Sequence, residues 1–388
     1  MTKPSSYREE LFQWIWQNLE FDCSQLQTAC GKSLQIVDTG EWNHGAGPDF
    51  LGVHLQIDGK EWFGSVEIHK KAGEWLQHAH HLDENFNSVV LHVVYQDEHY
   101  WEISTQDGHN PFTLFLKPYL TKKMYRLLEA KQQNGIACSG NISFINQEAF
   151  EEQVKIAHRE YLEYKVEELL EFYDASLPLS KAWKHSLIVG VYKTLGIPGN
   201  KTQMASLAQE ILSGAISLRD FQFVEEVEQL AFQQESKICW VHSGMRPASR
   251  PKIRVKQAAA LHQAIHQMPF RIFFKQDTGQ SWNHLLKMAD PKLLPGNSRL
   301  ALIKQIVFLP ALYLLGDLIH SIQLKKQVLE AWKSGTQYVP EEVKKPFKRA
   351  GFQLNKATNV VGLAHYYKRY CREKNCHQCE VFKKAIRS

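Results

Sequence analysis

The chain has 388 residues, 44% of them hydrophobic and 11% aromatic, which excludes a disordered protein and leaves room for two or three domains. The N-terminus is charged rather than signal-like, and no apolar run reaches about 18 residues, so we expect a cytoplasmic protein without a membrane-spanning helix. The net charge of +5 is uneven: residues 1–240 carry 20 Lys and Arg against 33 Asp and Glu, whereas residues 241–388 carry 26 against 8. Such a basic C-terminal part favours contact with a polyanion.

The first 125 residues predict an α/β domain that opens with a helix over residues 7–29. Asp58-Gly59, between two alternating apolar and polar segments, is a strong hairpin signal. The continuous apolar run within 88–96 indicates a strand buried on both faces. The expected strands are 33–43, 49–58, 61–69, 88–96 and 100–105, with a further helix over 72–86.

The remainder predicts helices, interrupted mainly by a Pro-rich loop between Val241 and Arg254. The expected helices are 147–174, 180–195, 203–214, 219–234, 254–267, 298–316, 318–334 and 341–350. The predicted organisation is an α/β domain over 1–125, a mostly α-helical, basic domain over 140–365 and a cysteine-bearing tail over 366–388.

Two carboxylates mark a candidate metal site in the first domain. Asp49 begins one expected strand, and Glu67 lies on the next, where Glu67 and His69 share a face because side chains alternate along a strand. Mg²⁺ prefers oxygen ligands, and a bound metal ion lowers the pKa of water beside a phosphodiester. We therefore expect Asp49 and Glu67 to bind Mg²⁺ or Mn²⁺.

Pro48-Asp49, Glu67-Ile68-His69 and the order of the elements resemble the PD-(D/E)XK nuclease superfamily. The resemblance implies a restriction-endonuclease-like fold with a mixed sheet flanked by helices, Asp49 and Glu67 as metal ligands, and Glu10 or Glu9 as an auxiliary acid. His69 stands at the family's lysine position. Histidine there could orient or deprotonate water, bind the metal, or mark a site without activity, and Lys70 could substitute only through a strand irregularity.

Over nearly its full length the chain also resembles an uncharacterised bacterial family of unknown function. The segments "GPDF", "GSVEIH", "EWLQHAHHLDENFNSVVLHVVY" and "GMRPASRP" and the cysteine-bearing tail carry this resemblance. It implies a domain layout but no chemistry.

Several histidines follow the carboxylates. His78 or His80 could return towards them and contact nucleic acid, and His78 and His81 are i, i+3 neighbours on the expected helix. A zinc centre could combine His69 and His78 with His81 or Asp83. The alternative is a polar helix face together with a core histidine, His92.

The basic region supplies candidate nucleic-acid contacts. Arg246, Arg250 and Arg254 lie in the Pro-rich loop, and Arg299 opens a later helix. Guanidinium groups suit phosphate oxygens, and contacts of this kind carry little sequence selectivity. The alternative for each arginine is an ion pair that ties the domains together.

The tail contains the spacing C-x4-C-x2-C at Cys371, Cys376 and Cys379, which suits zinc or an iron–sulfur cluster. A fourth ligand could be Cys138, Cys239 or His377. The alternative is a set of thiols without metal.

Together these features predict a metal-dependent, nuclease-like protein that hydrolyses phosphodiester bonds in DNA or RNA, with nucleic acid as partner and no membrane. One alternative is a non-catalytic nucleic-acid-binding protein on a nuclease-like fold, and another is a protein–protein scaffold in which the oppositely charged parts pair. The sequence does not indicate an oligomeric state.

Overall fold

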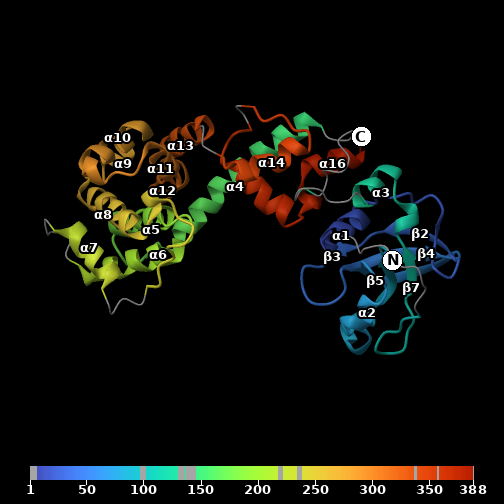
Figure 1. The fold of residues 1–388 in the computed structure, drawn as a ribbon. Helices are drawn as coiled ribbons and strands as arrows, with labels where there is room; N and C mark the ends of the chain where they lie inside the picture. The colour runs from blue at the N-terminus through green and yellow to red at the C-terminus, as the bar shows by residue number, and fades with distance from the viewer. Residues whose placement is uncertain are drawn as a thin grey trace. The chain divides into compact units, whose positions relative to one another are not determined.

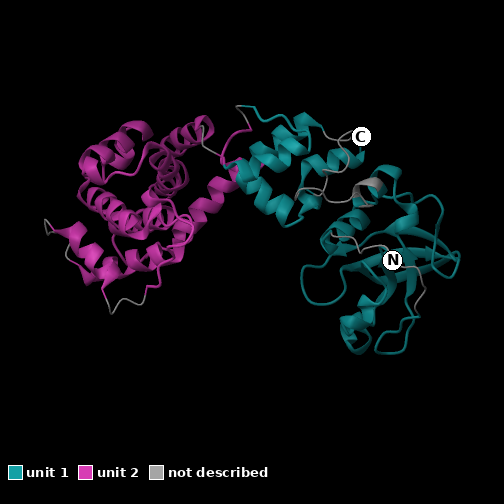
Figure 2. Ribbon diagram, in the orientation of Figure 1, with its two compact units in different colours: residues 1–155, 340–355, 363–388 teal, residues 156–339, 356–362 magenta. Residues whose placement is uncertain are grey.

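The computed structural model describes residues 7–96, 102–129, 136, 146–216, 222–233, 238–335, 339–355 and 358–387. Its contacts group into two compact units (Figure 2). Unit 1 comprises residues 1–155, 340–355 and 363–388, and unit 2 comprises residues 156–339 and 356–362. This grouping differs from the predicted division, because the last segments of the chain join the N-terminal domain instead of forming a separate tail.

Unit 1 contains a mixed seven-stranded sheet with the order β1-β2-β4-β5-β6-β7, in which β3 pairs with β4 (Figure 1). The pairs from β1 to β5 are antiparallel, and β5, β6 and β7 are parallel. The strands are β1 Leu26–Gln27, β2 Ser33–Asp38, β3 Glu41–Trp42, β4 Phe50–Ile57, β5 Lys60–His69, β6 Val89–Val94 and β7 Phe112–Phe115. An N-terminal mixed sheet with flanking helices, followed by a mostly helical region, is therefore confirmed.

The local patterns explain the central strands. Asp58 and Gly59 have φ angles of 48° and 74°, which close the two-residue hairpin turn between β4 and β5 as the sequence predicts. Every residue of β6 is buried, as expected for a strand covered on both faces. Gly64 permits close approach to β6, since a Cβ atom there would lie 2.4 Å from the Ser88 carbonyl oxygen.

Some predicted elements are wrong. The first helix, α1, spans only Glu9–Gln17, because Leu19 adopts a φ of 50° and β1 pairs with β2 soon afterwards. Residues 102–105 form no strand, residues 97–101 lie outside the described part, and β7 lies further along the chain. The expected helix 72–86 is a short α2, Glu74–Gln77, followed by 3₁₀ turns His80–Leu82 and Glu84–Phe86.

The C-terminal segments complete unit 1. The buried rings of Phe150 and Phe352 stack at 4.2 Å between centroids, and Tyr7 packs against Phe382. Arg8 donates a hydrogen bond of 2.8 Å to the side chain of Asn375. The helices that unit 1 contains or shares with unit 2, besides α1 and α2, are α3 Lys122–Glu129, α4 Gln147–Leu170, α14 Glu341–Arg349, α15 Gly362–Tyr366 and α16 Glu380–Arg387.

Unit 2 is helical and encloses its own apolar core around residues such as Trp183, Leu261 and Leu312. The predicted helical periodicity is confirmed, although α9 and α10 were not expected. Its helices, besides the end of α4, are α5 Leu179–Leu195, α6 Lys201–Glu210, α7 Phe223–Phe232, α8 Pro251–Gln267, α9 Ile272–Lys275, α10 Thr278–Met288, α11 Asn297–Ile303, α12 Leu309–Leu318 and α13 Ile322–Ser334.

One continuous helical stretch, Asn297–Leu318, has the length and apolar composition of a membrane span. This is weak evidence for a span, because 72% of its most apolar window is buried inside the protein.

Candidate functional site

Two hydrogen bonds from backbone N–H groups hold the carboxylates of Asp49 and Glu67. The backbone N–H of Asp49 donates to Glu67 Oε2 at 3.0 Å, and the backbone N–H of Ile68 donates to Asp49 Oδ2 at 2.9 Å. Asp49 directly precedes β4, and Glu67 lies on the antiparallel neighbour β5, where Phe50 pairs with Val66. The two predicted metal-binding carboxylates therefore lie beside each other at the sheet and are held there by its backbone.

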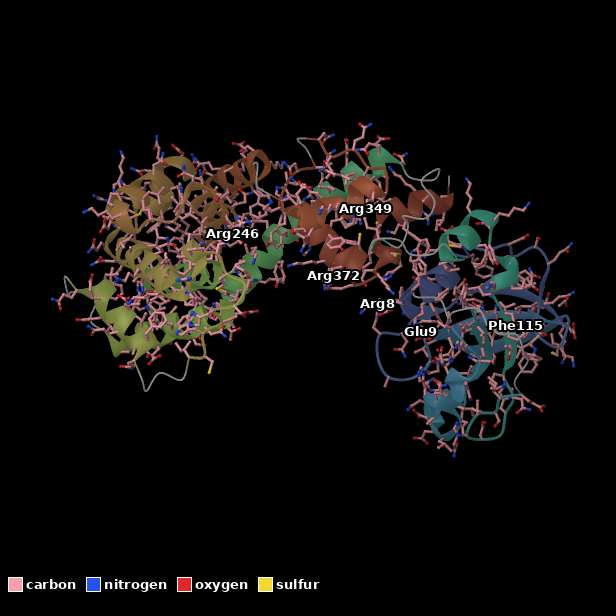
Figure 3. The ribbon with its side chains drawn as sticks, in the orientation of Figure 1. Arg8, Glu9, Phe115, Arg246, Arg349 and Arg372 are labelled. Carbon is pink, nitrogen blue, oxygen red and sulfur yellow. The ribbon has the colours of Figure 1, made fainter. Side chains whose placement is uncertain are left out.

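Helix α1 contributes two further residues, Glu9 and Gln13, which lie on one face of the helix because they are four residues apart. Gln13 donates a 2.6 Å hydrogen bond to Asp49 Oδ1. Glu9, labelled in Figure 3 at the start of α1, has a buried Oε1 atom without a hydrogen-bond partner among the described residues. Glu10 faces Arg8 at 3.9 Å, with 45% of its side chain exposed. Of the two acids expected on this helix, Glu9 is thus the more enclosed.

The carboxylates of Glu9, Asp49 and Glu67 form an acidic cluster, in which Glu67 is buried and the other two are half-buried. Burial raises the pKa of Asp49 above its ordinary value, and the neighbouring Glu67 raises it further. Burial likewise raises the pKa of Glu67. Burial, together with the nearby Asp49 and Glu74, raises the pKa of Glu9 to about 8. Like charges confined in this way favour either a shared proton or a bound cation.

Lys70 is a cation whose charge acts on this cluster. It follows the last residue of β5, and its charge lowers the pKa of Glu9, opposing the effect of burial. The pairing of β5 with β6 shifts register between Ser65 and Val66, so the strand is irregular before the site. The backbone N–H groups of Lys70 and Lys71 both donate to Glu74 Oε2.

His69 occupies the family's lysine position, and its side chain is only 1% exposed. Its Nε2 lies 3.4 Å from Glu67 Oε1, as the two-residue strand period predicts, and 3.2 Å from His78 Nδ1. Its Nδ1 lies 2.8 Å from Nε2 of the fully buried His92. Burial and the surrounding imidazoles lower the pKa of His69 strongly, so the ring is neutral and a weak base.

A left-handed residue brings His78 and His80 to the same place. Ala79 has a φ of 60°, which ends α2 and reverses the chain before the next 3₁₀ turn. His80 Nε2 consequently lies 3.2 Å from Glu67 Oε1, while its ring stacks on Phe86 with centroids 3.8 Å apart. One ring nitrogen from each of His69, His78 and His80 lies within 4.8 Å of the others.

The expected pairing of His78 with His81 depended on a helix that the chain does not form. Neither His81 nor Asp83 belongs to the histidine group. Asp83 instead accepts a hydrogen bond from the backbone N–H of Asn85 and caps a 3₁₀ turn. Local spacing alone gives no signal for the left-handed residue that selects His80.

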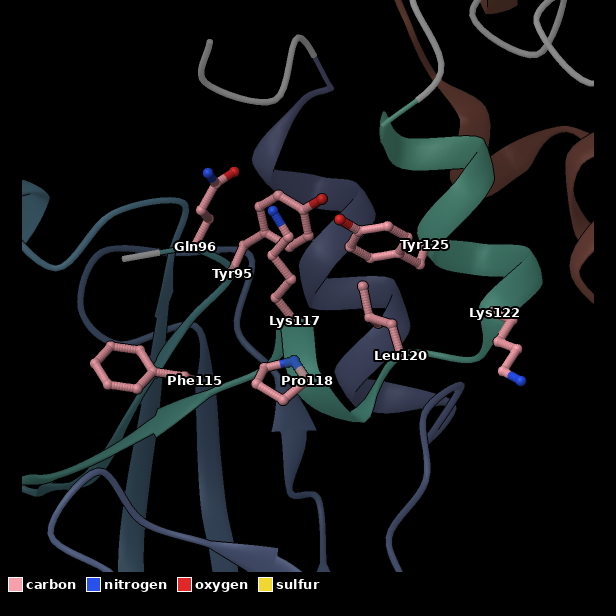
Figure 4. A pocket seen from close by; sticks show the side chains of 8 residues that line it. All are labelled: Tyr95, Gln96, Phe115, Lys117, Pro118, Leu120, Lys122 and Tyr125. Carbon is pink, nitrogen blue, oxygen red and sulfur yellow. The ribbon is translucent and has the colours of Figure 1, made fainter. Parts of the chain in front are cut away.

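A cavity of about 540 Å³ opens at the carboxyl end of the parallel strands (Figure 4). Tyr95 follows β6, and its backbone N–H donates to the carbonyl of His69, the last residue of β5, so the cavity and His69 share this edge. The lining residues are Tyr95, Gln96, Phe115, Lys117, Pro118, Leu120, Lys122 and Tyr125.

In unit 2 the four arginines expected to contact nucleic acid divide into two pairs. Arg246 and Arg250 are exposed. Arg254 is only 8% exposed and donates to Gln257 and Ser249, but its Nε has no hydrogen-bond partner and no ion pair links it to another described residue. Burial and the charge of Arg299 lower the pKa of Arg254 to about 10.

Arg299 has a structural contact of its own. Its guanidinium donates to the carbonyl oxygens of Thr194 at 3.4 Å and Ile197 at 3.2 Å, at the end of α5. Burial lowers its pKa.

The cysteines of the last segment lie within unit 1. Cys376 and Cys379 are buried, and Cys379 Sγ lies 3.3 Å from the hydroxyl of Tyr366. Among the residues that the structure describes, these thiols do not form a group of three or more ligand atoms within 4.8 Å of one another. Cys138 lies outside the described residues. Cys239 is exposed in unit 2.

Comparison with known proteins supplies a family but no activity. A family model described as "Protein of unknown function (DUF2851)" matches residues 9–234, more than half of the chain. No curated protein and no solved structure matches, so the comparisons show no resemblance to a nuclease. The match includes all the residues of the acidic cluster and the histidine group. The chain therefore belongs to the DUF2851 family of proteins of unknown function.

Proposed function

We propose that unit 1 is a metal-dependent, nuclease-like hydrolase that cleaves phosphodiester bonds in DNA or RNA, on a sheet similar to that of the PD-(D/E)XK superfamily. The arrangement of Asp49 and Glu67 carries the proposal. The two acids lie at neighbouring strands, accept hydrogen bonds from the backbone N–H groups of Ile68 and Asp49, and lie near a third acid, Glu9. Carboxylates are buried in this way mainly where they are paired or bind a metal ion.

The donor set suits a hard cation such as Mg²⁺ or Mn²⁺. Each carboxylate oxygen has two lone pairs, so Asp49 and Glu67 can bind an ion and keep their backbone hydrogen bonds. A bound ion would supply charge neutralisation and a more acidic water. Gln13 orients Asp49, and Glu9 offers a further buried oxygen. Lys70, rather than the neutral His69, is the positive group beside these acids.

Two separate observations support a phosphate-bearing substrate. Lys117 and Lys122 line the cavity at the edge of the sheet where β5 ends. In unit 2, Arg254 is a buried cation that makes no ion pair with a described residue, and Arg299 lies close enough to depress its pKa. Bringing an anion to such a pair relieves the repulsion between them.

The test is a cleavage assay with Mg²⁺ and Mn²⁺ on single- and double-stranded DNA and RNA. We expect Asp49→Ala and Glu67→Ala to abolish cleavage. Glu61→Ala is the matched control, because Glu61 is an exposed acid on the same strand whose partner is His54. Absence of cleavage by the wild type, or equal cleavage by all three variants, would contradict the proposal.

A non-catalytic nucleic-acid-binding protein is the second candidate. It is favoured by the hydrogen bonds that both oxygens of Asp49 already accept, and by the neutral histidine at the lysine position. Salt-dependent binding without metal-dependent cleavage would select this candidate.

A zinc or iron–sulfur site at Cys371, Cys376 and Cys379 also stays a proposal. Metal analysis of the full chain, compared with a Cys376→Ser variant, tests it.

A further inference from the structure

We propose that His69, His78 and His80 form a site for a divalent transition metal ion, with Zn²⁺ as the best-fitting ion. This site goes beyond the proposed hydrolytic centre, which uses a hard cation and carboxylate oxygens. The two sites are neighbours through Glu67, whose Oε1 lies near His69 and His80 while its Oε2 accepts the backbone N–H of Asp49.

The spacing of the donor atoms supports this geometry. Zinc lies about 2.0–2.1 Å from imidazole nitrogen and carboxylate oxygen, so neighbouring ligand atoms in a tetrahedron lie about 3.3–3.4 Å apart. His69 Nε2 lies 3.2 Å from His78 Nδ1 and 3.4 Å from Glu67 Oε1. His80 Nε2 lies 3.2 Å from the same oxygen. The separation of His69 from His78 is thus close to a tetrahedral edge, and the ligand nitrogens of all three histidines lie within 4.8 Å of one another.

The chemistry of the donors favours a transition metal ion over Mg²⁺. Neutral imidazole binds zinc, nickel and copper well, whereas Mg²⁺ prefers oxygen ligands and water. Three histidine ligands would leave the fourth position to a water molecule. Such a site would fix the turn around Ala79 to the end of β5 and thereby hold Glu67 in place.

Two surrounding features match a metal ligand set. His92 Nε2 lies 2.8 Å from His69 Nδ1, the kind of outer contact that fixes the orientation of a metal-bound imidazole. His80 Nε2 is buried, and although it lies near Glu67 it has no hydrogen-bond partner among the described residues. Hydrogen bonding between the histidines therefore does not account for this atom, whereas coordination would.

The experiment is a titration of the metal-free full chain with Co²⁺ and Zn²⁺. We expect one equivalent of Co²⁺ to give the visible absorption of tetrahedral nitrogen and oxygen coordination, without the near-ultraviolet thiolate band that binding at the cysteines would add. His78→Ala and His80→Gln should weaken binding by more than about 100-fold, the upper end of what losing an outer contact alone causes. Zn²⁺ should raise the Tm of the wild type but not of these variants.

Two controls separate this site from its surroundings. His81→Ala changes the adjacent histidine, which is outside the group, and should bind Co²⁺ as the wild type does. Asp49→Ala should also keep Co²⁺ binding, even where it removes cleavage, so failure of the hydrolase proposal and failure of this one give different results. A wild type without the tetrahedral Co²⁺ spectrum, or a His78→Ala variant with unchanged affinity, would overturn the proposal.

Discussion

Replacing Glu9 by glutamine should make unit 1 less sensitive to pH. Burial beside Asp49 and Glu74 raises the pKa of Glu9 from 4.5 to about 8, so the folded protein retains a proton that the unfolded chain releases. The stability that this retained proton contributes is fully present below about pH 4.5 and is lost as the pH rises through 8. Glu9→Gln keeps the shape of the side chain and removes this titration.

The magnitude follows from the size of the shift. One pKa unit corresponds to about 1.4 kcal/mol, so a carboxyl group with these two values lowers the free energy of unfolding by about 2–3 kcal/mol between pH 5 and pH 7. This is an upper limit, because the N-terminus of α1 favours the ionised form by about 0.3–1 kcal/mol. The wild type should therefore lose up to this amount over the interval, relative to Glu9→Gln.

The assay is urea unfolding in EDTA at pH 5, 6, 7 and 8, followed by tryptophan fluorescence, with Trp14 and Trp16 on the same helix as Glu9. Glu10→Gln controls for the loss of a negative charge from the first turn. Added Mg²⁺ should restore wild-type stability at pH 8, because a cation favours ionised carboxylates. A constant stability difference between wild type and Glu9→Gln at all four pH values would refute the reasoning.

Three further outcomes are expected. Gly64→Ala should lower the free energy of unfolding by about 1–3 kcal/mol, since its Cβ would meet the carbonyl oxygen of Ser88, directly before β6, at 2.4 Å. Gly73→Ala, with no atom within 4 Å of the added Cβ, is the control, and equal Tm values for the two variants would contradict this prediction. Trp332→Ala should lower the free energy of unfolding of unit 2 by about 3–5 kcal/mol in denaturant unfolding, because the indole is 2% exposed and donates to a backbone carbonyl. A decrease below about 1 kcal/mol would contradict this prediction. Arg254→Met should leave the Tm unchanged or raise it, because the substitution removes a buried charge that makes no ion pair with a described residue. It should also weaken nucleic-acid binding and make that binding less dependent on salt, as measured by fluorescence anisotropy. Unchanged affinity would show that Arg254 does not contact the nucleic acid.

Short-range patterns in the sequence were sufficient for several features of the fold. Asp58-Gly59 predicted the hairpin because only a few residue types tolerate the backbone angles of a two-residue turn. The apolar run before Tyr95 predicted a strand buried on both faces. The strand period predicted that Glu67 and His69 share a face, and their side chains lie 3.4 Å apart.

The composition of the candidate site depended on tertiary structure. The sequence did not distinguish Glu9 from Glu10, since both stand in the first turn of α1, and packing of that helix against the sheet enclosed Glu9. Gln13 carried no chemical signal, yet it binds Asp49. Which residues of one helix approach a strand depends on contacts between segments far apart in the chain.

The sequence by itself determined the hairpin of β4 and β5, the buried strand β6 and most of the helices, and it placed Asp49 and Glu67 at neighbouring strands, because those properties follow from periods of two and 3.6 residues and from turn chemistry. Only the tertiary structure decided that His80 instead of His81 joins His69 and His78, and that the last segment of the chain packs into unit 1. The first depends on one left-handed residue, Ala79, and the second on long-range contacts such as that of Arg8 with Asn375. Neither has a local sequence signal, because both conformations are stabilised by residues remote from them along the chain.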